Sequence, residues 1–148
     1  MPRWLCIDPG SKRIGVAVGD TSGGIATPVE TLSPEPFEQL ARRLGELAGE
    51  YDAAGLVVGW PLNMNDSEGP EGRKARELAS RLAAETHLDV RMWDERLSSF
   101  AADEALAGHL TRGKRRARQD AIAAAEILQD FLSSGGPDAA PEPDDATD

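Results

Sequence analysis

The spacing of apolar residues changes along the chain and predicts strands first, then helices that alternate with strands. Residues 4–7 are continuously apolar, as in a buried strand, and residues 14–19 alternate large apolar side chains with Gly or Ala. Pro and Gly at the centre of residues 8–11 are typical of a type II turn, which would join the two strands into a hairpin. Residues 24–32 predict a third strand, in which Pro28 favours a sheet edge or an irregularity.

Further along, the pattern predicts helices that connect parallel strands. Residues 36–51 are amphipathic, and residues 54–60 form a continuous apolar run typical of the centre of a parallel arrangement. A second helix at residues 71–86 leads to a strand ending at Asp94 and Glu95, and a terminal helix carries Asp120 on its apolar stripe. Right-handed crossovers make the later strands parallel. The predicted fold class is α/β, with a mixed five-stranded sheet of three antiparallel strands followed by parallel strands, flanked by helices.

Acidic residues lie at three places where an apolar element ends or begins, namely Asp8, the pair Asp94 and Glu95, and Asp120. A carboxylate on a buried face requires compensation, and a cation is one way to provide it. Oxygen ligands of this kind suit Mg²⁺ or Mn²⁺. Two such ions roughly 4 Å apart would activate water and stabilise the leaving oxygen in phosphodiester hydrolysis.

Each of these acids also has a purely structural interpretation. Asp8 fits a turn-initiating Asp, and Asp120 fits the N-cap of the terminal helix. Asp94 or Glu95 fits an ion pair with Arg96 at a solvated strand end. Periodicity alone does not decide which of these two neighbours faces a site, because they point to opposite faces of a strand.

Three other segments bear on function. Gly15 and Gly19 leave one face of the second strand open to the close approach of a ligand or of a helix. The polar loop at residues 61–70 follows the strand at 54–60, at the end where open α/β sheets bind ligands. A short helix is expected at residues 100–106, with Ser98 or Ser99 as its N-cap.

The net charge of −10 is unevenly distributed. Residues 135–148 are Pro-rich and contain five acids and no base, so the remainder carries about −5. We expect one domain at residues 1–134 and a disordered acidic tail at residues 135–148. The chain has one cysteine, no signal-peptide pattern and no apolar run of membrane length, which predicts a cytoplasmic protein with no membrane partner.

Basic residues concentrate immediately before Asp120, where five cations occupy seven positions: Arg112, Lys114, Arg115, Arg116 and Arg118. Lys12 and Arg13 add two cations just after Asp8. Neutralising phosphates supplies much of the affinity for nucleic acid, so these seven residues are candidates for nucleic-acid binding. A solvated helix end is the alternative for the longer cluster.

Four motifs occur in a fixed order, at residues 7–17, 57–63, 94–99 and 120–128. Together they resemble the YqgF family, the RuvX-type resolvases and pre-ribosomal RNA nucleases, over roughly residues 3–132. The order of predicted elements is that of the ribonuclease H-like fold of this superfamily. Compared with its junction-resolving relatives, the strand at residues 56–60 ends without a carboxylate, so the middle acid must come from the later strand.

The resemblance implies a metal-dependent nuclease with Asp8, Glu95 and Asp120 as catalytic acids. These would hold Mg²⁺ or Mn²⁺, with Asp94 as a supporting or alternative ligand. We expect an endonuclease, with exonuclease action left open, whose partner is structured or single-stranded RNA or branched DNA.

Three functions remain open at this point. The first is 5′-end maturation of pre-16S ribosomal RNA, and the second is cleavage of Holliday junctions, four-way DNA structures. The third is a non-catalytic regulatory module that binds nucleic acid. A junction resolvase needs a symmetric homodimer, whereas RNA processing needs one site and is open to a monomer.

Overall fold

The computed structural model describes residues 2–10, 12–95 and 112–143, with the backbone alone at residues 112–118 and 139. The elements follow in the order β1 (Arg3–Pro9), β2 (Ile14–Asp20), β3 (Ala26–Leu32), α1 (Phe37–Tyr51), β4 (Ala53–Trp60), α2 (Pro70–Thr86), β5 (Asp89–Asp94), α3 (Arg112–Ser133) and the short 3₁₀ helix η3 (Gly136–Ala139). The predicted helix at residues 100–106 lies outside the described residues.

The strands form one five-stranded sheet in the order β3-β2-β1-β4-β5. The β1–β2 and β2–β3 pairs are antiparallel, while β4 is parallel to both β1 and β5. This confirms the predicted mixed sheet. Pro28 lies in edge strand β3 beside a register shift opposite Val16 and Ala17, as its inability to donate a ladder hydrogen bond requires.

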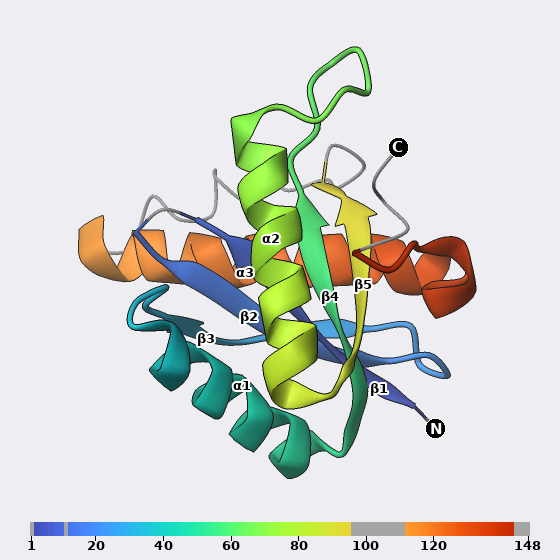
Figure 1. Cartoon of the computed structure of the whole chain (residues 1–148). Helices are drawn as coiled ribbons and strands as arrows, with labels where there is room; N and C mark the ends of the chain where they lie inside the picture. Colours follow the sequence, from blue (N-terminus) through green and yellow to red (C-terminus); the bar gives the residue numbers. More distant parts are fainter. Residues whose placement is uncertain (1, 11, 96–111, 144–148) are drawn as a thin grey trace.

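Helices cover both faces of the sheet, with α1 and α2 on one face and α3 on the other (Figure 1). Successive residues of a strand point to opposite faces, so β1 contributes to both cores. Leu5 and Ile7 pack with the helices α1 and α2, whereas Trp4 and Cys6 pack with α3. The same alternation directs Asp8, at the end of β1, to the α3 face.

The α3 core contains the residues that the spacing from Asp120 predicts: Ala123, Ala124, Ile127, Leu128 and Phe131 are all buried. The Phe131 ring lies 5.4 Å from Trp4 and 5.8 Å from Trp93, between ring centroids, in tilted and edge-to-face arrangements. The Trp93 indole N–H donates to Asp130 at 2.8 Å. These contacts fasten α3 to the centre and to one edge of the sheet.

The first hairpin turns later than the sequence predicts. Pro9 pairs with Ile14 in the ladder, so the connection spans residues 10–13 and the predicted type II turn at residues 8–11 is wrong. A Cβ atom on Gly10 would lie 2.5 Å from the carbonyl oxygen of Arg13, so glycine is needed for this close approach. The longer ladder keeps Asp8 inside regular strand geometry.

The stretch Gly136 to Pro143, which belongs to the predicted acidic tail, packs against the folded domain in the structure. After η3, the buried Ala140 packs on the α3 core, and the Pro141 carbonyl accepts a hydrogen bond from the Met92 amide at 2.8 Å. The Arg91 guanidinium donates to two further carbonyls of this segment. Composition did not reveal this docking, because it depends on backbone carbonyls and on one distant arginine. Residues 144–148 lie outside the described residues.

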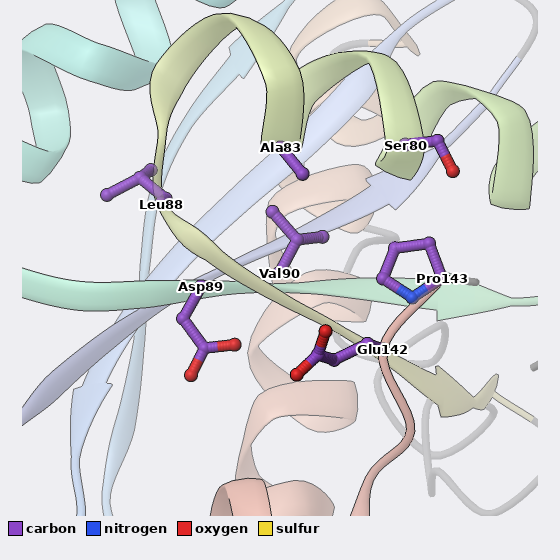
Figure 2. A pocket seen from close by; sticks show the side chains of 7 residues that line it. All are labelled: Ser80, Ala83, Leu88, Asp89, Val90, Glu142 and Pro143. Atoms are coloured by element: carbon purple, nitrogen blue, oxygen red, sulfur yellow. The ribbon is translucent and has the colours of Figure 1, made fainter. Parts of the chain in front are cut away.

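A pocket of about 160 Å³ lies where this segment meets α2 and β5 (Figure 2). Its lining residues are Ser80, Ala83, Leu88, Asp89, Val90, Glu142 and Pro143. The pocket adjoins the start of β5, whereas Glu95 follows the end of that strand. It is therefore separate from the acidic residues considered below.

Within the described ranges, the structure contains no helix long and apolar enough to cross a membrane.

Candidate active site

Three elements bring carboxylates to the α3 side of the sheet at one end of the parallel strands. Asp8 is the next-to-last residue of β1, Glu95 comes directly after β5, and Asp120 lies eight residues after the start of α3. Because β4 separates β1 from β5 in the sheet, Asp8 and Glu95 face each other across it. A Cβ atom on Gly59 of β4 would lie 3.0 Å from Glu95 Oε2, so this glycine makes room for the carboxylate.

Asp8 and Glu95 share a hydrogen bond between their carboxyl groups. The pKa of Asp8 rises from 3.8 to about 8, first because the group is buried, and then because of the charge and hydrogen bond of Glu95 and the charge of Asp120. Burial also raises the pKa of Glu95. The two raised pKa values mean that the carboxyl groups share one proton between them at neutral pH.

Strand alternation separates Asp94 from this pair. Val90 and Met92 belong to the core beneath α1 and α2, while Trp93 belongs to the core beneath α3. By this alternation, Asp94 points to the same face as Val90 and Met92, and Glu95 points to the same face as Trp93. Asp94 acts on the pair through its charge, which contributes to the raised pKa of Glu95.

Asp120 is held by Arg13. The guanidinium Nε donates to Asp120 Oδ2 at 2.6 Å, and the two side chains are 37% and 30% exposed. The N-cap interpretation of Asp120 is wrong, since α3 already begins at Arg112. Its position on the buried stripe is confirmed by the buried residues that follow it.

The backbone of α3 packs directly on β2 at Gly15, where the strand has no side chain on that face. A Cβ atom on Gly15 would lie 1.8 Å from the Asp120 carbonyl oxygen, an impossible contact. At Gly15 the helix is therefore the occupant. A Cβ atom on Gly19 would lie 2.7 Å from the Ile25 carbonyl oxygen and 3.0 Å from the Leu132 side chain of α3, so both the chain before β3 and the helix approach Gly19. Gly15 sets how deeply Asp120 sits over the sheet.

The donor set suits a divalent cation but is not assembled as a complete metal site. Among the described residues, no three side chains of His, Cys, Asp or Glu are arranged to hold a metal ion as they stand. Glu95 Oε2 is buried and has no hydrogen-bond partner in the described part of the chain. A buried carboxylate oxygen without a hydrogen-bond partner, next to a second carboxyl group, is stabilised by a nearby positive charge. At Asp120, the Arg13 guanidinium provides this positive charge.

The predicted basic residues divide between two places. Lys12 is exposed beside the hairpin turn, and Arg13 contacts Asp120 rather than solvent alone. The cluster from Arg112 to Arg118 lies in the first turns of α3, immediately before Asp120. Sequence reasoning missed the ion pair of Arg13 and the space that Gly59 provides. The only available signal was the proximity of Arg13 to Asp8 along the chain.

The model of the family described as RuvX, Holliday junction resolvase, matches residues 2–134. The chain belongs to the RuvX family. RuvX relatives include a protein of Nitrobacter hamburgensis that is 46% identical over 127 residues, covering 85% of this chain and 78% of its own length. Another, from Ruegeria sp., is 44% identical and covers 85% and 81% of the two chains. Both carry the name "Putative pre-16S rRNA nuclease".

Solved structures with the same fold confirm the ribonuclease H-like architecture expected for a RuvX protein. RuvC of T. thermophilus, in complex with a Holliday junction substrate, gives a TM-score of 0.55 at 16% identity, covering 91% of this chain and 97% of that one. The fowlpox virus Holliday junction resolvase gives 0.52 at 12% identity, covering 89% and 99%. As a RuvX family member, the chain is a nuclease, a phosphodiester hydrolase that acts on nucleic acid, and the family implies dependence on a divalent metal.

Proposed function

We propose that this RuvX-family nuclease cleaves the precursor of 16S ribosomal RNA during maturation of its 5′ end. The observation that carries the proposal is the half-buried carboxyl pair of Asp8 and Glu95, brought by two parallel strands to the side of the sheet where α3 places Asp120. The names of the relatives, at 44–46% identity, support ribosomal RNA as the substrate.

Asp8, Glu95 and Asp120 are the proposed ligands of Mg²⁺ or Mn²⁺, and Asp94 would act through its charge from the opposite face. When bound, such an ion activates water and stabilises the leaving oxygen of the scissile phosphate. The unpartnered Glu95 Oε2 provides a ready donor. Asp120 becomes available when Arg13 releases it, and the freed guanidinium is then free to bind a phosphate oxygen.

The proton on Asp8 has a consequence for metal binding. A carboxyl with a pKa of about 8 is largely protonated at neutral pH, and it must lose that proton before it can bind a cation with full charge. Metal loading therefore becomes easier as the pH rises toward 8. Within this proposal, nuclease activity increases over the same range.

The basic residues at the start of α3, together with Lys12, would hold the phosphate backbone on either side of the cut. Endonucleolytic cleavage of RNA needs only one such site, so a monomer is sufficient, and the reaction would take place in the cytoplasm. Holliday junction cleavage, which the family description names, is the second candidate and requires a homodimer.

The experiment compares a labelled RNA spanning the 5′ end of 16S ribosomal RNA with a synthetic four-way DNA junction, each in Mg²⁺ or Mn²⁺. Wild type is tested beside Asp8→Asn, Glu95→Gln and Asp94→Asn. We expect RNA cleavage that falls at least 100-fold in the first two variants and much less in the third.

Two results would contradict the proposal. Paired cuts in the junction with intact RNA would support the resolvase function instead. Binding of either substrate without cleavage by wild type would indicate the non-catalytic module.

A further inference from the structure

The loop that follows β4, at residues 61–69, leaves the sheet between the strands that carry the acids. β4 has β1, with Asp8, on one side and β5, with Glu95 after its end, on the other. In Figure 1 the loop projects beyond the end of the sheet between β4 and the start of α2. A polymer lying across this edge would therefore meet the loop as well as the acids.

The loop has a defined shape that its own polar groups maintain. The Asn63 amide donates to the Ser67 carbonyl at 2.9 Å, and the Asp66 amide donates to the Asn63 carbonyl at 2.9 Å. Asn65 Oδ1 accepts from both the hydroxyl and the amide of Ser67, at 2.6 and 3.2 Å. Asp66 adopts a left-handed conformation, with φ at 69°, to close the turn.

A half-buried network of hydrogen bonds and an ion pair holds the base of the loop against α2. Arg76 donates twice to the Glu68 carboxylate, at 2.9 and 3.0 Å, and the Trp60 indole N–H donates to the same carboxylate at 3.1 Å. The Glu68 and Arg76 side chains are each only 22% exposed. Gly72 leaves the necessary space, since a Cβ atom there would lie 2.9 Å from Glu68 Cγ. Bidentate pairing of this kind fixes direction as well as distance.

This well-fastened loop presents an apolar side chain to solvent. Met64, near its tip, is 92% exposed. An unbranched thioether adapts to flat partners and packs well against rings. A rigid loop that displays such a residue beside phosphodiester-cleaving acids fits contact with an unstacked base, where the backbone is held elsewhere by cations.

We propose that residues 61–69 form a substrate-contacting loop in which Met64 packs on an unpaired base of the nucleic acid, and that Glu68 is the positioning residue that holds the loop through Trp60 and Arg76. The inference rests on the proposed nuclease function and adds a preference for substrates with an unpaired or easily unstacked nucleotide near the cut.

The first test measures binding without cleavage, in the Asp8→Asn background, by fluorescence anisotropy with a single-stranded RNA and with a fully paired RNA duplex. Met64→Ala is expected to weaken single-strand binding about fivefold or more, as for the loss of one base contact, and to change duplex binding less than twofold. Met64→Leu should largely retain affinity. Ile25→Ala is the matched control, because Ile25 is another exposed apolar residue, at 71%, located at the opposite end of the sheet.

The second test separates positioning from a merely structural role. In the active enzyme, Glu68→Gln should raise KM about fivefold while kcat stays within twofold. In the Asp8→Asn background, the double variant Met64→Ala/Glu68→Gln should bind no more weakly than Met64→Ala alone, because both changes remove the same contact. Glu30→Gln is the control. Glu30 of edge strand β3 makes the same kind of bidentate pair with Arg43 of α1, at 2.7 and 3.0 Å.

The outcomes distinguish this inference from the proposed function. If wild type cleaves RNA and Met64→Ala binds it as tightly as its parent, the loop contact is wrong and the nuclease function stands. If Glu68→Gln lowers kcat and KM is unchanged, or if the two substitutions add fully, Glu68 does not position the loop. If wild type neither binds nor cleaves nucleic acid, both proposals fail together.

Discussion

At the scale of the residue, the proton shared by Asp8 and Glu95 makes folding sensitive to pH. The pKa of Asp8 in the folded chain is about 8, above its ordinary value of 3.8, so the folded state binds this proton more tightly than the unfolded state. The contribution to stability is complete below about pH 4 and is lost as the pH rises through about 8. In the proposed metal site, a divalent cation would replace the proton and reverse this loss.

We predict that Asp8→Asn raises the free energy of unfolding of the metal-free protein by about 1–3 kcal/mol at pH 8 and much less at pH 5. Urea unfolding in a chelator, at several pH values, measures this difference. Asp52→Asn is the control, since Asp52 is exposed at the C-cap of α1 in a left-handed conformation that Asn tolerates. Parallel stability curves for wild type and Asp8→Asn would contradict the shared proton.

In the proposed metal site, Arg13 and the metal ion would compete for Asp120. We predict that Arg13→Gln tightens Mn²⁺ binding about 3- to 10-fold, because the Asp120 carboxylate is no longer held at 2.6 Å by a guanidinium. Titration calorimetry measures the affinity without any substrate. Lys12→Gln removes the same charge from the neighbouring exposed residue. Equal effects of the two substitutions would mean that only the general electrostatic potential matters.

At the scale of the element, α3 and β2 meet backbone to backbone at Gly15. We predict that Gly15→Ala destabilises the protein by about 2 kcal/mol or more, because α3 must move away from the sheet. Asp120 moves with the helix, so nuclease activity falls although no carboxylate is altered. Thermal unfolding and metal titration together test both effects.

Gly45→Ala is the control for Gly15→Ala, and it is expected to increase stability rather than decrease it. Gly45 lies in the exposed part of α1, and a Cβ atom there would meet no atom within 4 Å. Gly45→Ala should therefore stabilise the protein by about 0.5–1 kcal/mol through helix propensity. A stability loss at Gly15 no different from the change at Gly45 would refute the close packing.

The elements themselves were largely predictable, because their signals are local. The stripe of α1 and the apolar runs of β1 and β4 appear directly in the residue spacing, and the predicted mixed sheet is confirmed. The turn after β1 was misplaced because ladder pairing, rather than the Pro-Gly dipeptide, decides where the hairpin reverses.

The candidate site was predictable in its residue types but not in its pairings. The choice between Asp94 and Glu95 needed the faces of β5, which become known only when Met92 and Trp93 are assigned to different cores. The ion pair of Arg13 with Asp120 joins residues 107 positions apart, and no sequence period reports such a contact. The roles of the three acids stay a prediction that mutagenesis must test.

At the scale of the whole molecule, the charge is segregated. Despite a net charge of −10, five cations lie in the seven positions from Arg112 to Arg118, next to the candidate site. The affinity for a polyanion depends more on this local excess of positive charge than on the net charge of the chain, because counterions are released where phosphates are neutralised.

We predict that Arg115→Gln/Arg116→Gln weakens RNA binding and reduces the slope of log affinity against log salt concentration by about 1–2. Filter binding from 50 to 300 mM salt measures both quantities. Arg42→Glu changes the net charge by the same amount at an exposed position of α1, on the other face of the sheet, and should leave the slope unchanged. A slope that responds equally in both variants would show that the cluster does not touch the phosphates.

The segment from Gly136 to Pro143 also limits how two copies of this protein can associate. Its Pro141 carbonyl already accepts the Met92 amide of border strand β5, while the opposite border strand, β3, is interrupted by Pro28. Neither side offers an uninterrupted row of amides and carbonyls for a neighbour's strand. We therefore expect any pairing of subunits to proceed through helices or loops, leaving the sheet at five strands.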